Sequence, residues 1–74
     1  MASLEQKYNK LLKRVGANLK RIRTSRALSQ TDMTGYGFEL RYYQRLESGK
    51  HSPSLFTLFK LADALGCDIS EFLN

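Results

Sequence analysis

The chain has 74 residues, 42% of them hydrophobic, and a formal net charge of +5 at pH 7. This length fits one domain, and the scarcity of Val and Ile argues against a β-sheet. The single cysteine excludes an internal disulfide, no apolar run is long enough to cross a bilayer, and the N-terminus lacks the apolar core of a signal peptide. With one histidine and one cysteine there is no metal-ligating or catalytic cluster, so we expect no enzyme, no metal and no cofactor.

The positive charge is concentrated in the N-terminal part of the chain. Residues 1–28 contain eight Lys and Arg against one acid, a net charge of +7, whereas residues 29–74 contain four bases and six acids, a net charge of −2. A small basic domain is typical of proteins that bind a polyanion.

The first predicted helix begins after Ser3 and runs to about Ser25. Ser3 and Gln6 match a capping box, in which each side chain bonds to the backbone N–H of the other residue. An apolar stripe follows at spacings of three and four, formed by Leu4, Tyr8, Leu11, Leu12, Val15, Leu19 and Ile22. Gly16 suggests that another helix approaches closely. Three interpretations stay open: a core-packing helix with a solvated basic face, a short coiled coil, and a basic helix on a membrane surface. Residues 1–9 form a helical extension that could serve dimerisation.

A second, shorter helix is predicted to begin after Ser29. The Ser29 hydroxyl is suited to accept from a free backbone N–H at a helix start, and Asp32 places a carboxylate at the positive end of the helix dipole. Met33 is its inward apolar position. Gly35 and Gly37 are predicted to break this helix, since glycine lowers helix stability and permits a positive φ.

A third helix is predicted from about Glu39 to Gly49. Tyr43 and Leu46 recur at helical spacing and are predicted to lie in the core. The remaining positions are rich in Arg, Gln and Tyr. Two short helices joined by a tight glycine turn, the second with such a polar and aromatic face, favour a helix-turn-helix that reads the major groove of DNA.

The rest of the chain predicts two more helices. Pro53 suits the first turn of the next helix, with Ser52 or Ser54 as its cap, and Gly66 ends it. The apolar positions of that helix are Leu55, Leu58, Phe59, Ala62 and Leu65. After Asp68 comes a final short helix, expected to turn Ile69, Phe72 and Leu73 inward. The pattern predicts an all-α fold of five helices around one core, a single domain over residues 1–74.

Several short motifs occur in an order typical of one family. They are Gly16-x-x-Leu19-x-x-x-Arg23, Leu28-Ser29-Gln30, Gly37, Leu46-Glu47-x-Gly49, Pro53-Ser54-Leu55 with Leu58 and Leu61-Ala62, and Leu65-Gly66-x-x-Ile69-x-Glu71-Phe72-Leu73. Through them the chain from Leu12 onward resembles the phage-repressor-like helix-turn-helix family, of the Cro and XRE type. The resemblance implies a compact lambda-repressor-like domain and a transcriptional regulator that binds double-stranded DNA as a homodimer on a near-palindromic operator. It implies a cytoplasmic, nucleoid-associated protein of a prokaryote or phage. We expect no membrane partner and no small-molecule ligand.

The resemblance also implies which residues contact DNA bases. The matching positions are Leu40, Arg41, Gln44 and Arg45, all on the third helix. An arginine there could pair with guanine and the glutamine with adenine.

Phosphate contacts are expected around the same helix. Gln30, Lys50 and Ser54 match positions of this kind in the family, and Tyr42 and His51 are further candidates. Tyr42 is expected to contact a phosphate or a thymine methyl, or else to pack at the rim. His51 is expected near a phosphate, or else simply exposed. Such contacts set the register on DNA without reading its sequence.

Arg23 and Glu47 resemble a partly buried ion pair that ties the first helix to the end of the third. Since a buried charge is costly without its partner, losing either one is expected to weaken folding. Two features depart from the family pattern. The turn before the third helix is one residue shorter than usual, and Glu39 stands where a Ser or Thr cap is common.

Two alternatives to a dimeric regulator stay open. One is a protein-binding module of the same fold, such as an antitoxin or an adaptor, and the other is the DNA-binding fragment of a longer regulator. For a dimer, the predicted surface is formed by the last helices, through Phe72 and Leu73.

Overall fold

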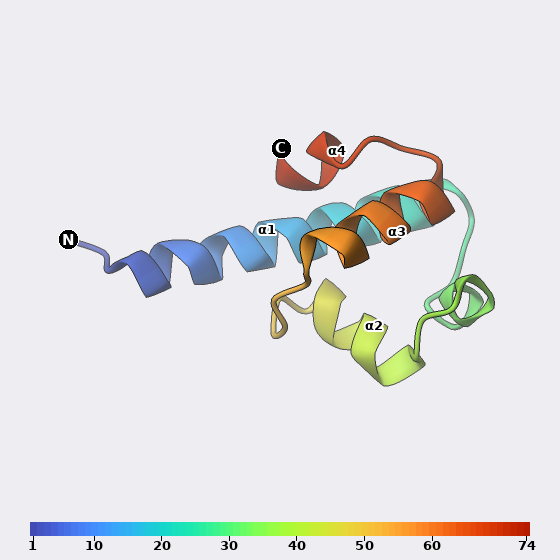
Figure 1. The fold of residues 1–74 in the computed structure, drawn as a ribbon, viewed down its shortest axis with the longest axis horizontal. Helices are drawn as coiled ribbons and strands as arrows, with labels where there is room; N and C mark the ends of the chain where they lie inside the picture. The colour runs from blue at the N-terminus through green and yellow to red at the C-terminus, as the bar shows by residue number, and fades with distance from the viewer.

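The computed structural model describes all 74 residues, and the fold is built from helices alone (Figure 1). Its elements are α1, Leu4–Ser25; η1, a 3₁₀ helix, Thr31–Tyr36; α2, Leu40–Glu47; α3, Leu55–Leu65; and α4, Ser70–Leu73. The predicted all-α fold with five helices is therefore confirmed. None of these helices is both long enough and apolar enough to cross a membrane.

The longest element, α1, extends beyond the rest of the fold at its N-terminal end (Figure 1). The Ser3 hydroxyl accepts from the backbone N–H of Gln6, and the Gln6 side chain accepts from the backbone N–H of Ser3, as the capping box predicts. Residues 1–10 are all exposed, whereas Val15, Leu19 and Ile22 are buried on one side of the helix. From its middle onward α1 is thus a core-packing helix.

The two helices α1 and α2 meet at Gly16. A Cβ atom at this position would lie 2.3 Å from the carbonyl oxygen of Glu47 and 2.7 Å from that of Leu46. Because glycine has no side chain, the last turn of α2 rests directly on α1. The prediction that Gly16 permits a close helix approach is confirmed, and this contact helps to set the orientation of α2.

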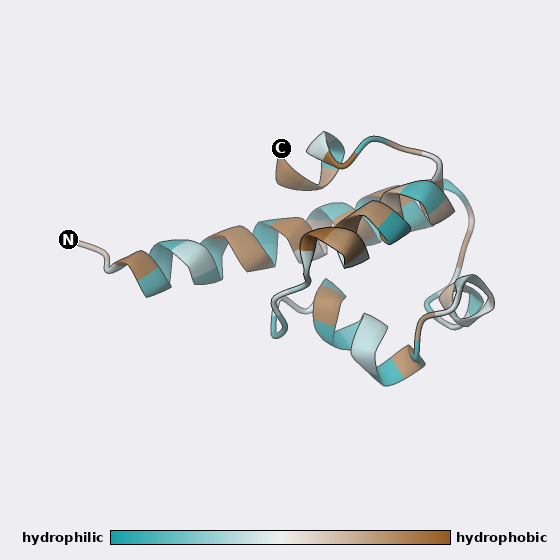
Figure 2. Ribbon diagram, in the orientation of Figure 1, coloured by the Kyte–Doolittle hydropathy of each residue, from teal (hydrophilic) through white to brown (hydrophobic).

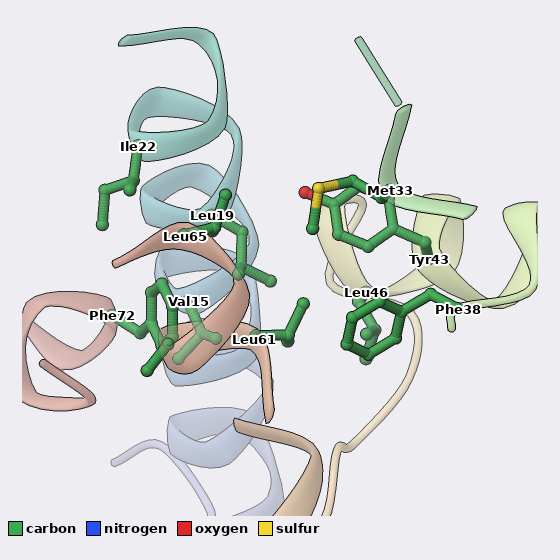
Figure 3. Close-up of a cluster of buried hydrophobic side chains, with 11 residues drawn as sticks. Val15, Leu19, Ile22, Met33, Phe38, Tyr43, Leu46, Leu61, Leu65 and Phe72 are labelled. Carbon is green, nitrogen blue, oxygen red and sulfur yellow. The ribbon is translucent and has the colours of Figure 1, made fainter. Parts of the chain in front are cut away.

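Eleven buried apolar residues, drawn from every helix and from the turn before α2, form one core (Figure 3). They are Val15, Leu19, Ile22, Met33, Phe38, Tyr43, Leu46, Leu61, Ala62, Leu65 and Phe72. Met33, Tyr43 and Leu46 are each at most 2% exposed, which confirms their predicted place in the core. Both short helices of the motif are therefore anchored by apolar side chains on their inner faces.

The second helix differs from its prediction in type and in its end. It is a 3₁₀ helix that contains Gly35 and ends only at Gly37, whose φ is 89°. The prediction that Gly35 breaks the helix is wrong, because glycine permits a positive φ without requiring one. The cap is as predicted: the Ser29 hydroxyl accepts from the backbone N–H of Asp32, and the Asp32 carboxylate accepts from that of Ser29.

Two predictions about the C-terminal helices are wrong. Pro53 precedes α3, because the Ser54 hydroxyl accepts from the backbone N–H of Thr57 and the helix begins only at Leu55. Leu73 is 44% exposed, whereas Phe72 is fully buried. Since α4 is only four residues long, it can turn few side chains toward α1. Phe72 has no surface left for a partner and cannot belong to the dimer surface predicted for the last helices.

One side of α3 presents apolar side chains to solvent. Leu61 and Leu65 are buried, but Leu55, Phe56 and Phe59 are 74%, 71% and 60% exposed. Figure 2 shows this hydrophobic stretch at the start of α3, and a further one near the free end of α1.

Candidate nucleic-acid interface

An acidic residue starts α2. The Glu39 carboxylate accepts from the backbone N–H of Arg41 at 3.1 Å and therefore caps the helix in place of the usual Ser or Thr. A negative charge at this end is favoured by the helix dipole. The departure from the family pattern at Glu39 thus has a local structural reason.

The two sides of α2 differ sharply in character. Tyr43 and Leu46 are buried against the core, while Arg41, Gln44 and Arg45 are exposed on the opposite side. Three of the four predicted base-contacting residues therefore lie on one free helical face. The fourth, Leu40, is half-buried in the first turn.

The exposed face of α2 continues into the loop that follows it. Arg41, Gln44, Arg45, Ser48 and Lys50 line a shallow hollow that contains no hydrophobic residue. This hollow, the α2 hollow below, joins three predicted base contacts with one predicted phosphate contact, and its lining carries three positive charges and no acid. Sequence reasoning did not single out Ser48, although it stands four positions after Gln44 and so on the same helical face.

A buried ion pair holds α2 to α1. Arg23 donates to both carboxylate oxygens of Glu47, at 2.6 Å from Nε and 3.1 Å from Nη2, and its Nη1 donates to the carbonyl oxygen of Leu28 at 2.6 Å. The two charged side chains are 7% and 4% exposed. Such a bidentate pair fixes geometry as well as adding energy.

The environment of this pair changes the protonation of three groups. Burial by itself raises the pKa of Glu47, but hydrogen bonds led by that from Arg23 outweigh it, so the pKa is lowered. The hydrogen bond to Glu47 raises the pKa of Arg23. The Tyr43 hydroxyl lies buried beside the pair without a hydrogen-bond partner, and burial raises the pKa of Tyr43. At neutral pH the pair is therefore fully charged.

Gln30 links the buried pair to the α2 hollow. Its amide nitrogen donates to Glu47 at 3.1 Å, and its amide oxygen accepts from the Gln44 side chain at 3.3 Å. The predicted phosphate ligand Gln30 is half-buried and is held within the protein at both ends. The same contacts orient Gln44, a role that spacing along the sequence did not indicate.

The other candidate phosphate contacts cluster after α2. The rings of Tyr42 and His51 meet edge to face, with centroids 4.8 Å apart, and both residues are half-buried. Lys50 is exposed and free of hydrogen bonds from its side chain, whereas the Ser54 hydroxyl is engaged in capping α3. The hydroxyls of Tyr8 and Ser52 share a hydrogen bond, which ties this loop to α1.

This arrangement, a short helix, a glycine turn and a second helix with a basic outer face, agrees with comparisons to known proteins. A family model described as helix-turn-helix matches residues 19–72. The chain belongs to this XRE-like helix-turn-helix family. As a helix-turn-helix domain it has α2 in the position of the recognition helix, the second helix of the motif.

The helix-turn-helix chain is also similar to individual proteins. It is 40% identical over 63 residues to the uncharacterized HTH-type transcriptional regulator y4dJ of Sinorhizobium fredii (strain NBRC 101917 / NGR234), a match covering 84% of this chain and 82% of that protein. The restriction-modification controller protein C.AhdI from Aeromonas hydrophila has 32% identity and a TM-score of 0.78, over 82% of this chain and 94% of that one. The DNA-binding domain of BldD has 26% identity and a TM-score of 0.83, and the match covers 89% of this chain and 97% of that one.

Proposed function

We propose that this DNA-binding transcriptional regulator reads a specific operator by inserting α2 into the major groove. The observation that carries the proposal is the α2 hollow, in which Arg41, Gln44 and Arg45 are gathered on the side of the helix opposite the buried Tyr43 and Leu46. Arg and Gln side chains on one face of a recognition helix can form two hydrogen bonds to a single base edge in the major groove. Arg41 or Arg45 would pair with guanine and Gln44 with adenine.

Phosphate contacts would hold the helix in register. Lys50 is exposed beside the α2 hollow and supplies a free positive charge. Further phosphate contacts would come from Tyr42 on α2, His51 in the loop after it, and Ser54 at the start of α3. Gln30 would act on DNA mainly by orienting Gln44. Contacts of this kind fix position on the duplex but carry no sequence information.

The proposed assembly is a homodimer on a near-palindromic operator, acting on DNA in the cytoplasm. One domain of this size reads only a few base pairs, and two copies related by two-fold symmetry place their recognition helices in successive major grooves, about 34–36 Å apart. Binding would block or recruit RNA polymerase.

Selection of bound duplexes from a random DNA pool tests this proposal. The wild-type chain is expected to enrich a two-fold symmetric motif. Arg41→Ala, Gln44→Ala and Arg45→Ala are each expected to relax preference at one base position per half-site, by about 1–3 kcal/mol. Arg14→Ala is the matched control, because it removes the same charge as Arg41→Ala or Arg45→Ala but from an exposed position on α1. It is expected to leave the selected motif unchanged. If no DNA motif is enriched and none of the four substitutions changes DNA affinity, the proposal that α2 recognises a specific base sequence is refuted.

A protein-binding module of the same fold is the second candidate. The exposed Leu55, Phe56 and Phe59 on α3 favour it, since contiguous apolar surface marks an interaction site. Salt distinguishes the two functions, because DNA binding weakens steeply as counterions are released, whereas an apolar protein interface responds little.

A further inference from the structure

Two apolar surfaces of this chain lack any cover. The first is the α3 face, defined here as Leu55, Phe56 and Phe59, which are 74%, 71% and 60% exposed. The second is on the α1 arm, defined as residues 1–10, where Leu4 is 84% and Tyr8 is 43% exposed. Single exposed apolar residues are ordinary, but whole helix faces of this kind usually meet a partner.

The inner end of the arm lies near the loop that precedes α3. Leu4 and Tyr8 continue, at helical spacing, the stripe that packs Leu11, Val15 and Leu19 into the core, so they lie on the side of α1 that faces the core further along. The hydrogen bond between Tyr8 and Ser52 places the end of the arm beside the loop that leads into α3. Figure 1 shows the arm projecting past the start of α3 along the axis of α1.

The arm cannot cover the α3 face of its own chain. It is a straight continuation of α1, whose first turn is closed by the capping box, and it projects away from α3 (Figure 1). To fold back, α1 would have to break within its length and lose backbone hydrogen bonds. The arm is therefore positioned for a different molecule.

The charges of the two surfaces are complementary. Residues 1–14 contain four bases and one acid, a net charge of +3, whereas residues 55–74 contain one base and three acids, a net charge of −2. Asp63 stands four positions after Phe59, and both line a hollow with Ala62, Cys67, Asp68 and Ile69. An apolar arm flanked by Lys7 and Lys10 thus matches an apolar helix face flanked by Asp63.

The two phenylalanines of the α3 face alone expose too little area for a stable dimer. A buried aromatic side chain contributes about 150–250 Å², so Phe56 and Phe59 at their exposures of 71% and 60% supply roughly 200–330 Å². A standard interface needs about 800 Å² from each partner. In a two-fold symmetric dimer each copy contributes both its arm and its α3 face to the interface. Each arm–face contact therefore occurs twice, which adds to the buried area.

We propose that, in the homodimer, the α1 arm of each copy lies across the α3 face of the other. This inference rests on the homodimer of the proposed function and assigns its interface. It moves the interface away from Leu73, the remaining exposed apolar residue of α4.

Sedimentation equilibrium of the full chain tests the assignment. Leu4→Glu and Phe56→Glu change exposed residues, so folding measured by circular dichroism should be kept, while each raises the dimer dissociation constant at least about tenfold. Leu73→Glu is the matched control at the alternative surface and is expected to leave the dissociation constant unchanged.

A charge swap shows whether arm and face meet across the dimer. A chain with Lys7→Glu and Lys10→Glu, and a second chain with Asp63→Lys, should each dimerise poorly alone, because like charges then face each other. Mixed, they should form heterodimers detected by native mass spectrometry, since both arm–face contacts regain opposite charges. Lys20→Glu, an exposed charge change beyond the arm, should not form such selective heterodimers.

The outcomes separate this inference from the proposed function. The arm–face interface is overturned if Leu4→Glu leaves the dimer dissociation constant unchanged, or if Leu73→Glu dissociates the dimer. If the symmetric DNA motif is still enriched in either case, the operator proposal stands. A chain that stays monomeric, on DNA as well as free, and enriches no symmetric motif overturns both.

Discussion

Replacing Gly16 with alanine tests the contact that positions α2. The added Cβ atom would lie 2.3 Å from the carbonyl oxygen of Glu47, whereas ordinary contact begins at 3.4 Å, so α2 must shift by about 1.1 Å. The atoms in the way belong to the backbone and cannot rotate aside as a side chain can. Such a shift also moves Glu47 away from Arg23 and changes the presentation of Arg41 and Arg45 to DNA.

The expected cost follows from two opposing effects. Overpacking costs about 1–3 kcal/mol, and a backbone clash places Gly16→Ala at the upper end. Alanine in a helix interior gains about 1 kcal/mol over glycine. The net loss is about 2 kcal/mol, out of a total of roughly 4–11 kcal/mol for a chain of 74 residues. This corresponds to a melting temperature lower by about 8–16 °C.

Urea unfolding followed by circular dichroism measures this loss. Gly35→Ala is the matched control, because Gly35 has no atom within 4 Å of its added Cβ and no positive φ. It should be neutral or up to about 1 kcal/mol more stable, through the lower entropy of the unfolded chain. If Gly16→Ala is as stable as the wild type, with an unchanged dependence on urea, the direct contact between α1 and α2 is wrong.

Three further predictions concern single side chains. Glu47→Gln should lower the free energy of unfolding by about 3 kcal/mol at neutral pH, because it leaves a buried guanidinium without a counter-charge. Since the pKa of Glu47 is lowered from its ordinary 4.5, the stability gap to the wild type should be full above that pH and close as the pH falls below it. Urea titrations at several pH values measure this, with exposed Glu5→Gln as the control, and a gap that is constant with pH would contradict the assignment. Lys50→Ala should reduce the slope of log binding constant against log salt concentration by about 0.9, measured by fluorescence anisotropy on the selected operator, and an unchanged slope would remove it from the phosphate contacts. Ala27 has a φ of 58°, so Ala27→Gly should stabilise the fold by up to about 1 kcal/mol, whereas Ala64→Gly inside α3 should destabilise it by about the same amount. Thermal melts show whether Ala27→Gly raises and Ala64→Gly lowers the melting temperature, and a lower melting temperature for Ala27→Gly would contradict the prediction.

Much of the architecture is set by interactions between residues close in sequence. The caps at Ser3 and Ser29, and the ends at Gly37 and Gly66, follow from backbone groups three or four positions away. The helical periods that placed Tyr43 and Leu46 inside are local in the same sense. These features could be predicted because a helix turn contains both the signal and its partner.

The candidate site could be predicted only in part. The exposed face with Arg41, Gln44 and Arg45 follows from the helical period, because that period also marks the inner face. The contacts of Gln30 with Gln44 and Glu47 span 14 and 17 positions, and no spacing rule along the chain indicates them. They arise only when η1 and α2 are brought together.

Coverage of apolar residues was decided by the tertiary structure alone. Leu61 and Phe59 are equally apolar on one helix, yet one is fully buried and the other 60% exposed, and the same contrast separates Phe72 from Leu73. An apolar side chain gains free energy when it leaves water, whatever its position in the chain. Whether it is buried depends on contacts with helices that are distant in sequence. The sequence by itself therefore determined the helices, most of their ends and the inner face of the motif. Only the packing of the helices against one another decided which apolar faces remained free for a partner.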